Sequence, residues 1–112
     1  MLIGCYIVII VKRFENKIVL VTGGARCIGY NLVKRFCAEG AKVYFSDILT
    51  DEGENVAAEH KGQAVFIKHD VTSEEDWKMV TDQIQKKEGR LDVLVNNAGI
   101  AIHEPIGEMT LN

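Results

Sequence analysis

One short segment constrains the fold of this chain more than any other: an apolar run that passes directly into glycines. Residues 18–21 read Ile-Val-Leu-Val without polar alternation, as expected of a strand buried on both faces of a parallel sheet. The turn that follows reads Thr22-Gly23-Gly24-Ala25-Arg26-Cys27-Ile28-Gly29. From Ile28 onward, apolar residues recur at helical spacing. The segment therefore predicts a strand, a tight turn and a helix.

A helix that begins at such a turn creates a site for an anion. Its first backbone N–H groups have no partner within the helix, and they carry the positive end of the helix dipole. A diphosphate group fits this position. An ordinary strand-to-helix turn can have the same composition, so the glycines alone leave both interpretations open.

Further polar residues follow the later apolar runs. Asp47 stands 18 residues after Gly29 at the end of run 43–45, where an acidic residue can hold a ribose diol. Asp70-Val71 follows run 64–68, and residues 96–99 read Asn-Asn-Ala-Gly.

In order and spacing, these motifs resemble the short-chain dehydrogenase/reductase family over about residues 13–112. The spacing disfavours the family's extended, epimerase-like branch, whose second glycine would stand at Arg26. The resemblance and the alternation of strands with helices imply an α/β fold with right-handed crossovers. We expect a Rossmann-like, doubly wound parallel sheet, incomplete, with strand order 3-2-1-4 and flanking helices.

The expected elements follow from the apolar periodicity. The strands are 18–21, 42–46, 64–68 and 91–95, and the helices are 26–39, 51–60 and a third that ends near residue 88. A capping box, Thr72-x-x-Glu75, is expected to open this third helix. Gly40, Gly62 and Gly89 follow the three helices as terminating residues.

The resemblance implies a set of cofactor-binding residues. These are Gly23, Gly24, Arg26, Cys27, Ile28, Gly29, Asp47, Asp70, Val71, Asn96, Ala98 and Gly99. Asp70 would hydrogen-bond the adenine, Val71 would pack on it, and residues 96–99 would line the cofactor. Asp70 as a simple turn former is the alternative.

The acidic residue at position 47 indicates which dinucleotide is bound. A carboxylate accepts hydrogen bonds from a free 2′,3′-diol and repels a 2′-phosphate, so Asp47 favours NAD over NADP. Arg26 favours NADP instead, because its side chain could reach a 2′-phosphate. The alternatives are a helix-capping aspartate and a solvated loop arginine.

Cys27 departs from the family pattern, which has glycine at this position. A side chain there would point toward the phosphates or strain the loop, and positive φ would cost about 1–3 kcal/mol. We therefore expect weakened cofactor affinity. A reactive thiol at a helix N-terminus and a relaxed, degenerate copy are the two other interpretations.

The sequence contains a pair with the same spacing as the family's catalytic Tyr-x-x-x-Lys motif, but at a different place in the chain. Tyr30 and Lys34 show that spacing, but on the first helix, and we assign them no catalytic role. The family's serine, tyrosine and lysine would follow the Asn-Asn-Ala-Gly block at a distance. We expect the chain to be the truncated cofactor-binding part of an NAD-dependent oxidoreductase acting on an alcohol or ketone, inactive alone. A non-catalytic dinucleotide-binding module and a non-functional remnant are the alternatives.

Composition and charge limit the partners and the cellular compartment that we expect for this chain. A net charge of −3 and the lack of a basic cluster argue against nucleic acid as a partner. Three cysteines without a C-x-x-C pair argue against a disulfide scaffold or metal site and suggest the cytoplasm. Residues 2–11 are apolar but too few to span a bilayer, which needs about 20, and we take Met1–Lys12 as a non-family extension. His60, His69 and His103 are expected to be exposed bystanders. Homo-oligomers are usual in the family.

Overall fold

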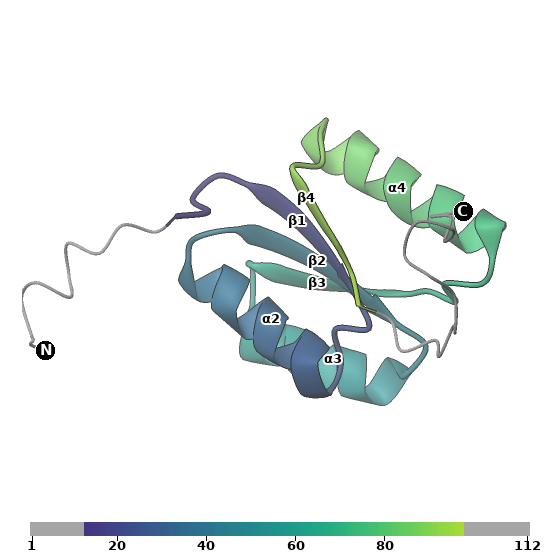
Figure 1. Ribbon diagram of the computed structural model, residues 1–112, viewed down its shortest axis with the longest axis horizontal. Coiled ribbons are helices and arrows are strands. Elements are labelled where there is room, and N and C mark those ends of the chain that lie inside the picture. Colours follow the sequence, from purple (N-terminus) through teal and green to yellow (C-terminus); the bar gives the residue numbers. More distant parts are fainter. Residues whose placement is uncertain (1–12, 98–112) are drawn as a thin grey trace, which may run out of the picture.

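The computed structural model describes residues 13–97 and has an α/β architecture. All strand pairs are parallel, and the four-stranded sheet has the order β3-β2-β1-β4 (Figure 1). The strands are β1 (Ile18–Thr22), β2 (Lys42–Asp47), β3 (Ala64–Lys68) and β4 (Val93–Asn96). The helices are α2 (Cys27–Ala38), α3 (Thr50–Glu59) and α4 (Glu74–Glu88). The predicted Rossmann-like fold and strand order are confirmed.

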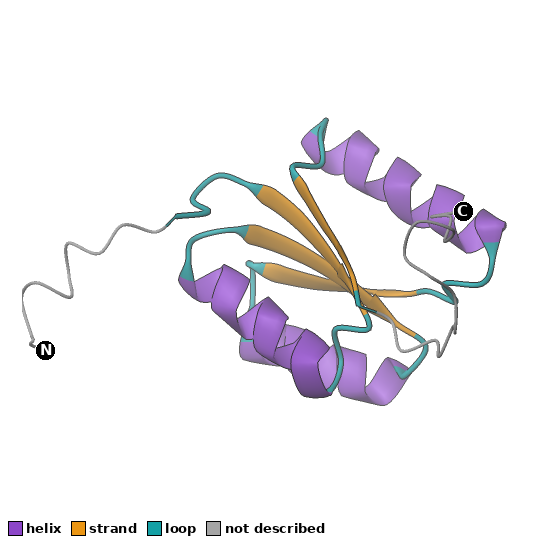
Figure 2. Ribbon diagram, viewed as in Figure 1, coloured by secondary structure: helices purple, strands orange, loops and turns teal. Residues whose placement is uncertain are grey.

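Helices cover both faces of the sheet: α2 and α3 lie on one face and α4 on the other (Figure 2). Every residue of β1 is buried, as its unbroken apolar sequence predicts. Val19 and Val21 belong to the core cluster beneath α2 and α3, whereas Ile18 and Leu20 belong to the cluster beneath α4. The strict alternation along β1 therefore places this strand at the centre of both cores.

The predicted ends of the first two helices lie within one residue of those observed. Arg26 and Glu39 are the caps of α2 rather than its terminal residues, and α3 begins and ends one residue early. Gly40, Gly62 and Gly89 all have positive φ, which confirms their predicted place after the helices.

The predicted capping box of the third helix is wrong by one residue. Ser73 caps α4, and its side chain accepts a hydrogen bond of 3.1 Å from the Asp76 N–H. The hydroxyl of Thr72 instead donates to Asp70 at 2.6 Å, so a local turn competes for the residue chosen from the sequence.

The predicted fourth strand also begins too early. Its first two expected residues, Leu91 and Asp92, precede β4. The Asp92 carboxylate accepts a hydrogen bond of 2.7 Å from the Ile18 N–H, which ties the start of β1 to this loop.

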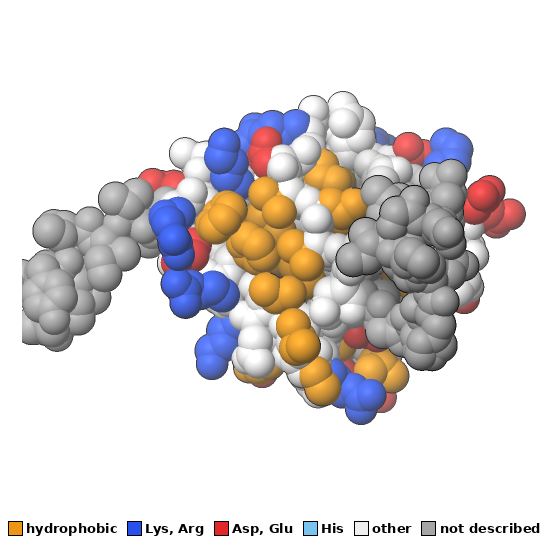
Figure 3. All heavy atoms as spheres, viewed as in Figure 1, with side chains coloured by type: hydrophobic (Ala, Val, Ile, Leu, Met, Phe, Trp, Pro, Cys, Tyr) orange, Lys and Arg blue, Asp and Glu red, His pale blue; other side chains and the backbone are white. Residues whose placement is uncertain are grey.

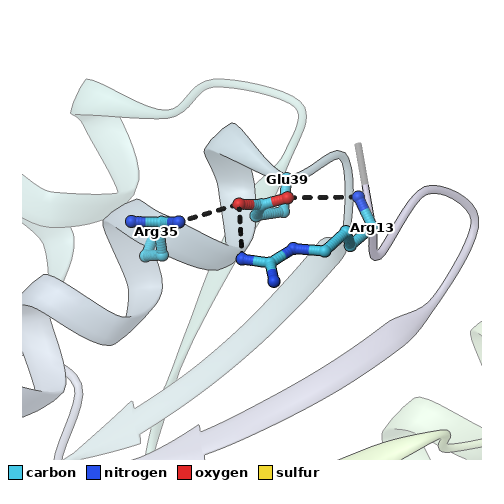
Figure 4. Close-up of polar contacts among 3 residues, drawn as sticks. All are labelled: Arg13, Arg35 and Glu39. Carbon is cyan, nitrogen blue, oxygen red and sulfur yellow. Dashed lines mark hydrogen bonds and ion pairs between the residues drawn. The ribbon is translucent and has the colours of Figure 1, made fainter. Parts of the chain in front are cut away.

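A cluster around Glu39 joins the beginning of the described chain to the end of α2 (Figure 4). Its carboxylate accepts hydrogen bonds from the Arg13 backbone N–H at 3.1 Å, from the Arg13 guanidinium at 3.4 Å and from Arg35 at 3.0 Å. These bonds lower the pKa of Glu39 to about 2. Phe14 adds an edge-on ring contact with Phe36, at 4.9 Å between centroids. The segment that leads into β1 is thus fixed on the C-terminal end of α2.

Hydrophobic side chains gather on the surface over α2 and the β4 side of the sheet (Figure 3). Leu32 and Phe36 of α2 and Val93 and Val95 of β4 are only partly buried there. Within residues 13–97, β4 pairs with β1 alone, and Leu94 remains 42% exposed. In the described part of the chain, β4 therefore forms an apolar edge of the sheet. In the same part, no helix combines the length and apolarity that crossing a membrane would need.

Candidate functional site

The main cavity lies where the strands end. Its volume is about 610 Å³, and it is formed by the turn after β1, the end of β2 and the loop that joins β3 to α4. The lining residues are Gly23, Arg26, Cys27, Ile28, Asp47, Ile48, Leu49, His69, Asp70, Val71, Thr72 and Asn97. In parallel α/β sheets this edge is where ligands bind. The structure therefore brings together most residues that were predicted from the sequence.

The backbone N–H groups of the first two glycines in the turn are bonded to the neighbouring strand β2. The N–H groups of Gly23 and Gly24 both donate to the Ser46 carbonyl, at 2.7 and 3.1 Å, so neither points freely toward an anion. Tyr30 donates to the Arg26 carbonyl at 3.2 Å, which closes the first turn of α2. The N–H groups of residues 27–29 precede that bond and are the ones available at the helix N-terminus.

Gly29 is required by a close approach of two backbone segments. A Cβ atom at this position would lie 1.8 Å from the Gly23 carbonyl oxygen and 2.7 Å from the Asn97 side-chain nitrogen. Gly24 is also confined, because a Cβ there would lie 2.7 Å from Cβ of Phe45. Both contacts bring α2 and its turn close to the sheet, as the family pattern implies.

Cys27 occupies a backbone conformation that favours glycine. Its φ is +56°, and it is the first residue of α2. The side chain is exposed and lines the cavity, so the thiol lies on the side from which a ligand would approach. The positive φ expected for this position is thus present, whereas proximity of the thiol to a phosphate stays a prediction.

Asp47 lies against the glycine turn rather than at the cap of α3. One carboxylate oxygen accepts from the Ala25 N–H at 3.2 Å and the other from the Leu49 N–H at 3.1 Å. The cap of α3 is Leu49, which makes no side-chain capping bond. The helix-capping alternative for Asp47 is therefore wrong, and the carboxylate belongs to the cavity.

Arg26 is an exposed arginine at the mouth of this cavity. It provides the only cationic side chain among the lining residues that the structure describes. The carboxylates of Asp47 and Asp70 line the same space. A ligand with both phosphate and hydroxyl groups would find partners of both kinds here.

Asp70 forms a turn, the role given as the alternative to binding adenine. One of its oxygens accepts from the backbone N–H and the hydroxyl of Thr72, at 2.9 and 2.6 Å, and these bonds lower its pKa. Because both bonds use the same oxygen, the second remains available to a ligand. Asp70 is exposed and Val71 is half-buried at the cavity.

The two asparagines at the end of β4 hold the turn from the opposite side. The Asn97 N–H donates to the Thr22 hydroxyl at 2.9 Å, and its side chain donates to the Gly23 carbonyl at 3.3 Å. The Thr22 hydroxyl lies 3.1 Å from the side-chain oxygen of Asn96. Of residues 96–99, which were predicted to line the cofactor, Asn97 lines the cavity and Asn96 does not. Ala98 and Gly99 lie outside the described residues.

His69 is the residue that the sequence analysis misjudged. It is 1% exposed, not an exposed bystander, and Nδ1 lies 2.8 Å from the Ser46 hydroxyl. Burial lowers its pKa, and the neighbouring carboxylates of Asp76 and Asp70 oppose that shift. The available signal was Ser46, a small polar residue after Val-Tyr-Phe in a run that is otherwise buried. Ile48, 62% exposed at the cavity rim, was also missed.

A parallel sheet with a close glycine turn, a helix N-terminus and an acidic residue on the neighbouring strand defines a Rossmann-like nucleotide-binding fold. The sequence model of the short chain dehydrogenase family matches residues 17–112. The chain belongs to this family of oxidoreductases.

Individual relatives agree with this assignment. Over 91 residues the chain is 48% identical to a 3-beta-hydroxysteroid dehydrogenase of Comamonas testosteroni, covering 81% of this chain and 36% of that protein. It is 42% identical over 97 residues to a cyclopentanol dehydrogenase of Comamonas sp., covering 84% and 39% respectively. The chain thus spans little more than a third of these relatives.

A solved structure shows the same fold. The 3-ketoacyl-(acyl-carrier-protein) reductase of Brucella melitensis, crystallised with NADH, is 37% identical and superposes with a TM-score of 0.74. The match covers 78% of this chain and 36% of that one.

Proposed function

We propose that this chain binds a nicotinamide adenine dinucleotide and prefers NAD(H) to NADP(H). The observation that carries the proposal is the Asp47 carboxylate, held by the Ala25 N–H at the edge of the cavity. Such a carboxylate can accept hydrogen bonds from a ribose diol, and it repels a phosphate in the same place. The NADH in the Brucella reductase supports the same ligand class.

The phosphates, the ribose and the adenine of the proposed ligand would lie along the cavity. The phosphates would lie against the N–H groups of residues 27–29 at the N-terminus of α2. The ribose would meet Asp47, and the adenine would lie between Ile48 and the loop of Asp70 and Val71. The exposed Ile48 side chain supports an apolar, flat ligand on this side.

We further propose that the chain is the cofactor-binding part of an oxidoreductase acting on an alcohol or ketone. Both named relatives act on alcohols, a hydroxysteroid in one case and cyclopentanol in the other. The bound nicotinamide would supply hydride chemistry. This chain's own residues would bind and orient it, and turnover would need the serine, tyrosine and lysine of the family pattern.

Calorimetric titration tests the proposal directly. NAD⁺, NADP⁺ and ADP-ribose are titrated separately into the 112-residue chain. We expect NAD⁺ and ADP-ribose to bind and NADP⁺ to bind more weakly. Absence of binding by all three would favour the remnant hypothesis, and tighter binding of NADP⁺ would refute the role given to Asp47.

The remaining alternative is a dinucleotide-binding module without catalysis. It predicts the same titrations, so the coding sequence downstream of residue 112 separates the two. A continuation that encodes the Ser and Tyr-x-x-x-Lys motifs supports the oxidoreductase. A different domain in that place supports the binding module.

A further inference from the structure

His69 is a buried polar side chain at the floor of the cavity, and the proposed function gives it no role. It is 1% exposed, and Ser46, its partner at 2.8 Å, is 0% exposed. Buried polar groups normally form hydrogen bonds, and a missing one costs stability. The pair therefore joins β2 to the end of β3 through two groups that water does not reach.

The β2 end of this pair holds the phosphate side of the site. The Ser46 carbonyl accepts from the N–H groups of both Gly23 and Gly24, and this fixes the turn after β1. The backbone N–H of His69 donates to the Asp47 carbonyl at 3.0 Å. The last two residues of β2, one fixing the turn and the other proposed to bind the ribose, are thus both bonded to His69.

The other side of the imidazole contacts the adenine side of the site. The ring of His69 lies 4.5 Å from that of Trp77 between centroids, with the planes at 86°. The Trp77 indole N–H donates to the Val71 carbonyl at 2.8 Å. Val71 belongs to the loop proposed to hold the adenine, so a second chain of contacts runs from His69 to the opposite wall of the cavity.

We propose that His69 is a positioning residue for the dinucleotide: its contacts with Ser46 and Trp77 set the distance between the two walls of the cavity. This inference rests on the proposed function, because the two walls are those assigned to the phosphate–ribose part and to the adenine. Nothing in the sequence motifs of the family match requires a histidine here. The role follows from the buried contacts alone.

Two conservative variants separate positioning from simple packing. In His69→Asn, the amide lies near the place of Nδ1 and can still bond the Ser46 hydroxyl. In His69→Gln, the amide lies nearer the place of Nε2 and leaves that hydroxyl without its partner. We expect His69→Gln to bind NAD⁺ about fivefold more weakly than the unaltered chain, as for one ordinary hydrogen bond. His69→Asn keeps the bond to Ser46 but loses the ring contact with Trp77, so its affinity should fall less than that of His69→Gln.

Tyr44→Phe is the matched control. Tyr44 is another buried polar residue of β2. Its hydroxyl donates to the Glu88 carboxylate at 2.6 Å, at the end of α4 opposite the cavity loop. Its loss should lower the melting temperature without changing NAD⁺ affinity. If Tyr44→Phe weakened binding as much as His69→Gln, general destabilisation would explain both results and the proposal would be overturned.

The amide resonances of Gly23 and Gly24 provide a readout beyond affinity. In ¹⁵N–¹H spectra of the unliganded chain, both should shift in His69→Gln and stay in place in His69→Asn and Tyr44→Phe. Unchanged glycine resonances and unchanged affinity in a folded His69→Gln variant would refute the positioning role. If the unaltered chain binds no dinucleotide, the proposed function fails, while the resonances still report whether His69 sets the turn.

Discussion

The Asp47 carboxylate accepts a hydrogen bond from the Ala25 backbone N–H at 3.2 Å, across two neighbouring strands. This contact fixes the acidic group against the turn that begins α2. Together with the bonds from the Gly23 and Gly24 N–H groups to the Ser46 carbonyl, it ties the turn to the end of β2. It also explains why Asp47 does not cap α3.

Replacing Asp47 tests the predicted preference between the two dinucleotides. We expect Asp47→Ser to bind NAD⁺ less tightly and NADP⁺ more tightly, so that the ratio of affinities changes about tenfold, or ~1.4 kcal/mol. The cause is loss of repulsion toward the 2′-phosphate together with loss of two acceptors for the diol. Asp51→Ser, in the first turn of α3, removes the same charge as a control and should leave the ratio unchanged.

Cys27→Gly should stabilise the chain. The positive φ of +56° is strained for cysteine and not for glycine. Part of the gain is offset by the greater entropy of glycine in the unfolded chain, which leaves about 0.5–1 kcal/mol in urea denaturation. NAD⁺ affinity should rise as well, because the side chain leaves the phosphate position. Cys27→Ala keeps the strained φ, so its stability should not rise, and an equal gain there would contradict this explanation.

Gly29→Ala should be severely destabilising. The new methyl group would lie 1.8 Å from the Gly23 carbonyl oxygen, so α2 must move away from the sheet. We expect a loss of about 3 kcal/mol or more in the free energy of unfolding and no measurable NAD⁺ binding. Gly62→Ala is the comparison, because its φ of +79° is strained but its side chain meets open space. A loss at Gly29 no greater than that at Gly62 would show that α2 can shift freely.

Glu39 predicts a specific dependence of stability on pH. Its pKa is lowered to about 2 by Arg13 and Arg35, below the value of the unfolded chain. The unfolded state therefore binds the proton first, and the contribution of Glu39 is complete at neutral pH and lost as pH falls from about 4.5 to about 2. Glu39→Gln should lower the melting temperature at pH 7, and the difference should shrink through this range.

Asp82→Asn serves as the control for Glu39. The carboxylate of Asp82 pairs with Lys78 at 3.0 Å, but both side chains are well exposed. Exposed pairs of this kind contribute little to stability. A pH-dependent difference as large as that of Glu39→Gln would mean that net charge, rather than the hydrogen bonds of Glu39, is responsible.

Local sequence was sufficient for features that depend on a single element. The apolar run at β1 indicated burial on both faces, because only a central parallel strand has no polar side. Gly29 was recognisable because a helix can approach a strand this closely only without a side chain. The capping of α4 was wrong by one residue because Thr72 and Ser73 are both capable caps, and the turn at Asp70 decided between them.

Features that join distant segments were not readable in the same way. His69 looked like a lone polar residue after a strand, and only the packing of α4 over β2 and β3 buries it. The N–H groups of Gly23 and Gly24 looked available to an anion, and only the neighbouring β2 brings the Ser46 carbonyl that takes them. Ser46, the hydrogen-bond partner of His69 and of both glycines, lies more than twenty positions from each of them in the chain.

The sequence by itself determined the order of strands and helices and the residues that meet where the strands end, since periodicity and glycine spacing act over a few residues. The tertiary structure alone decided which polar groups of that site face the cavity and which form hydrogen bonds within the protein. The physical reason is that a hydrogen bond is satisfied by whichever group packing brings within about 3 Å, and packing is a property of the whole fold.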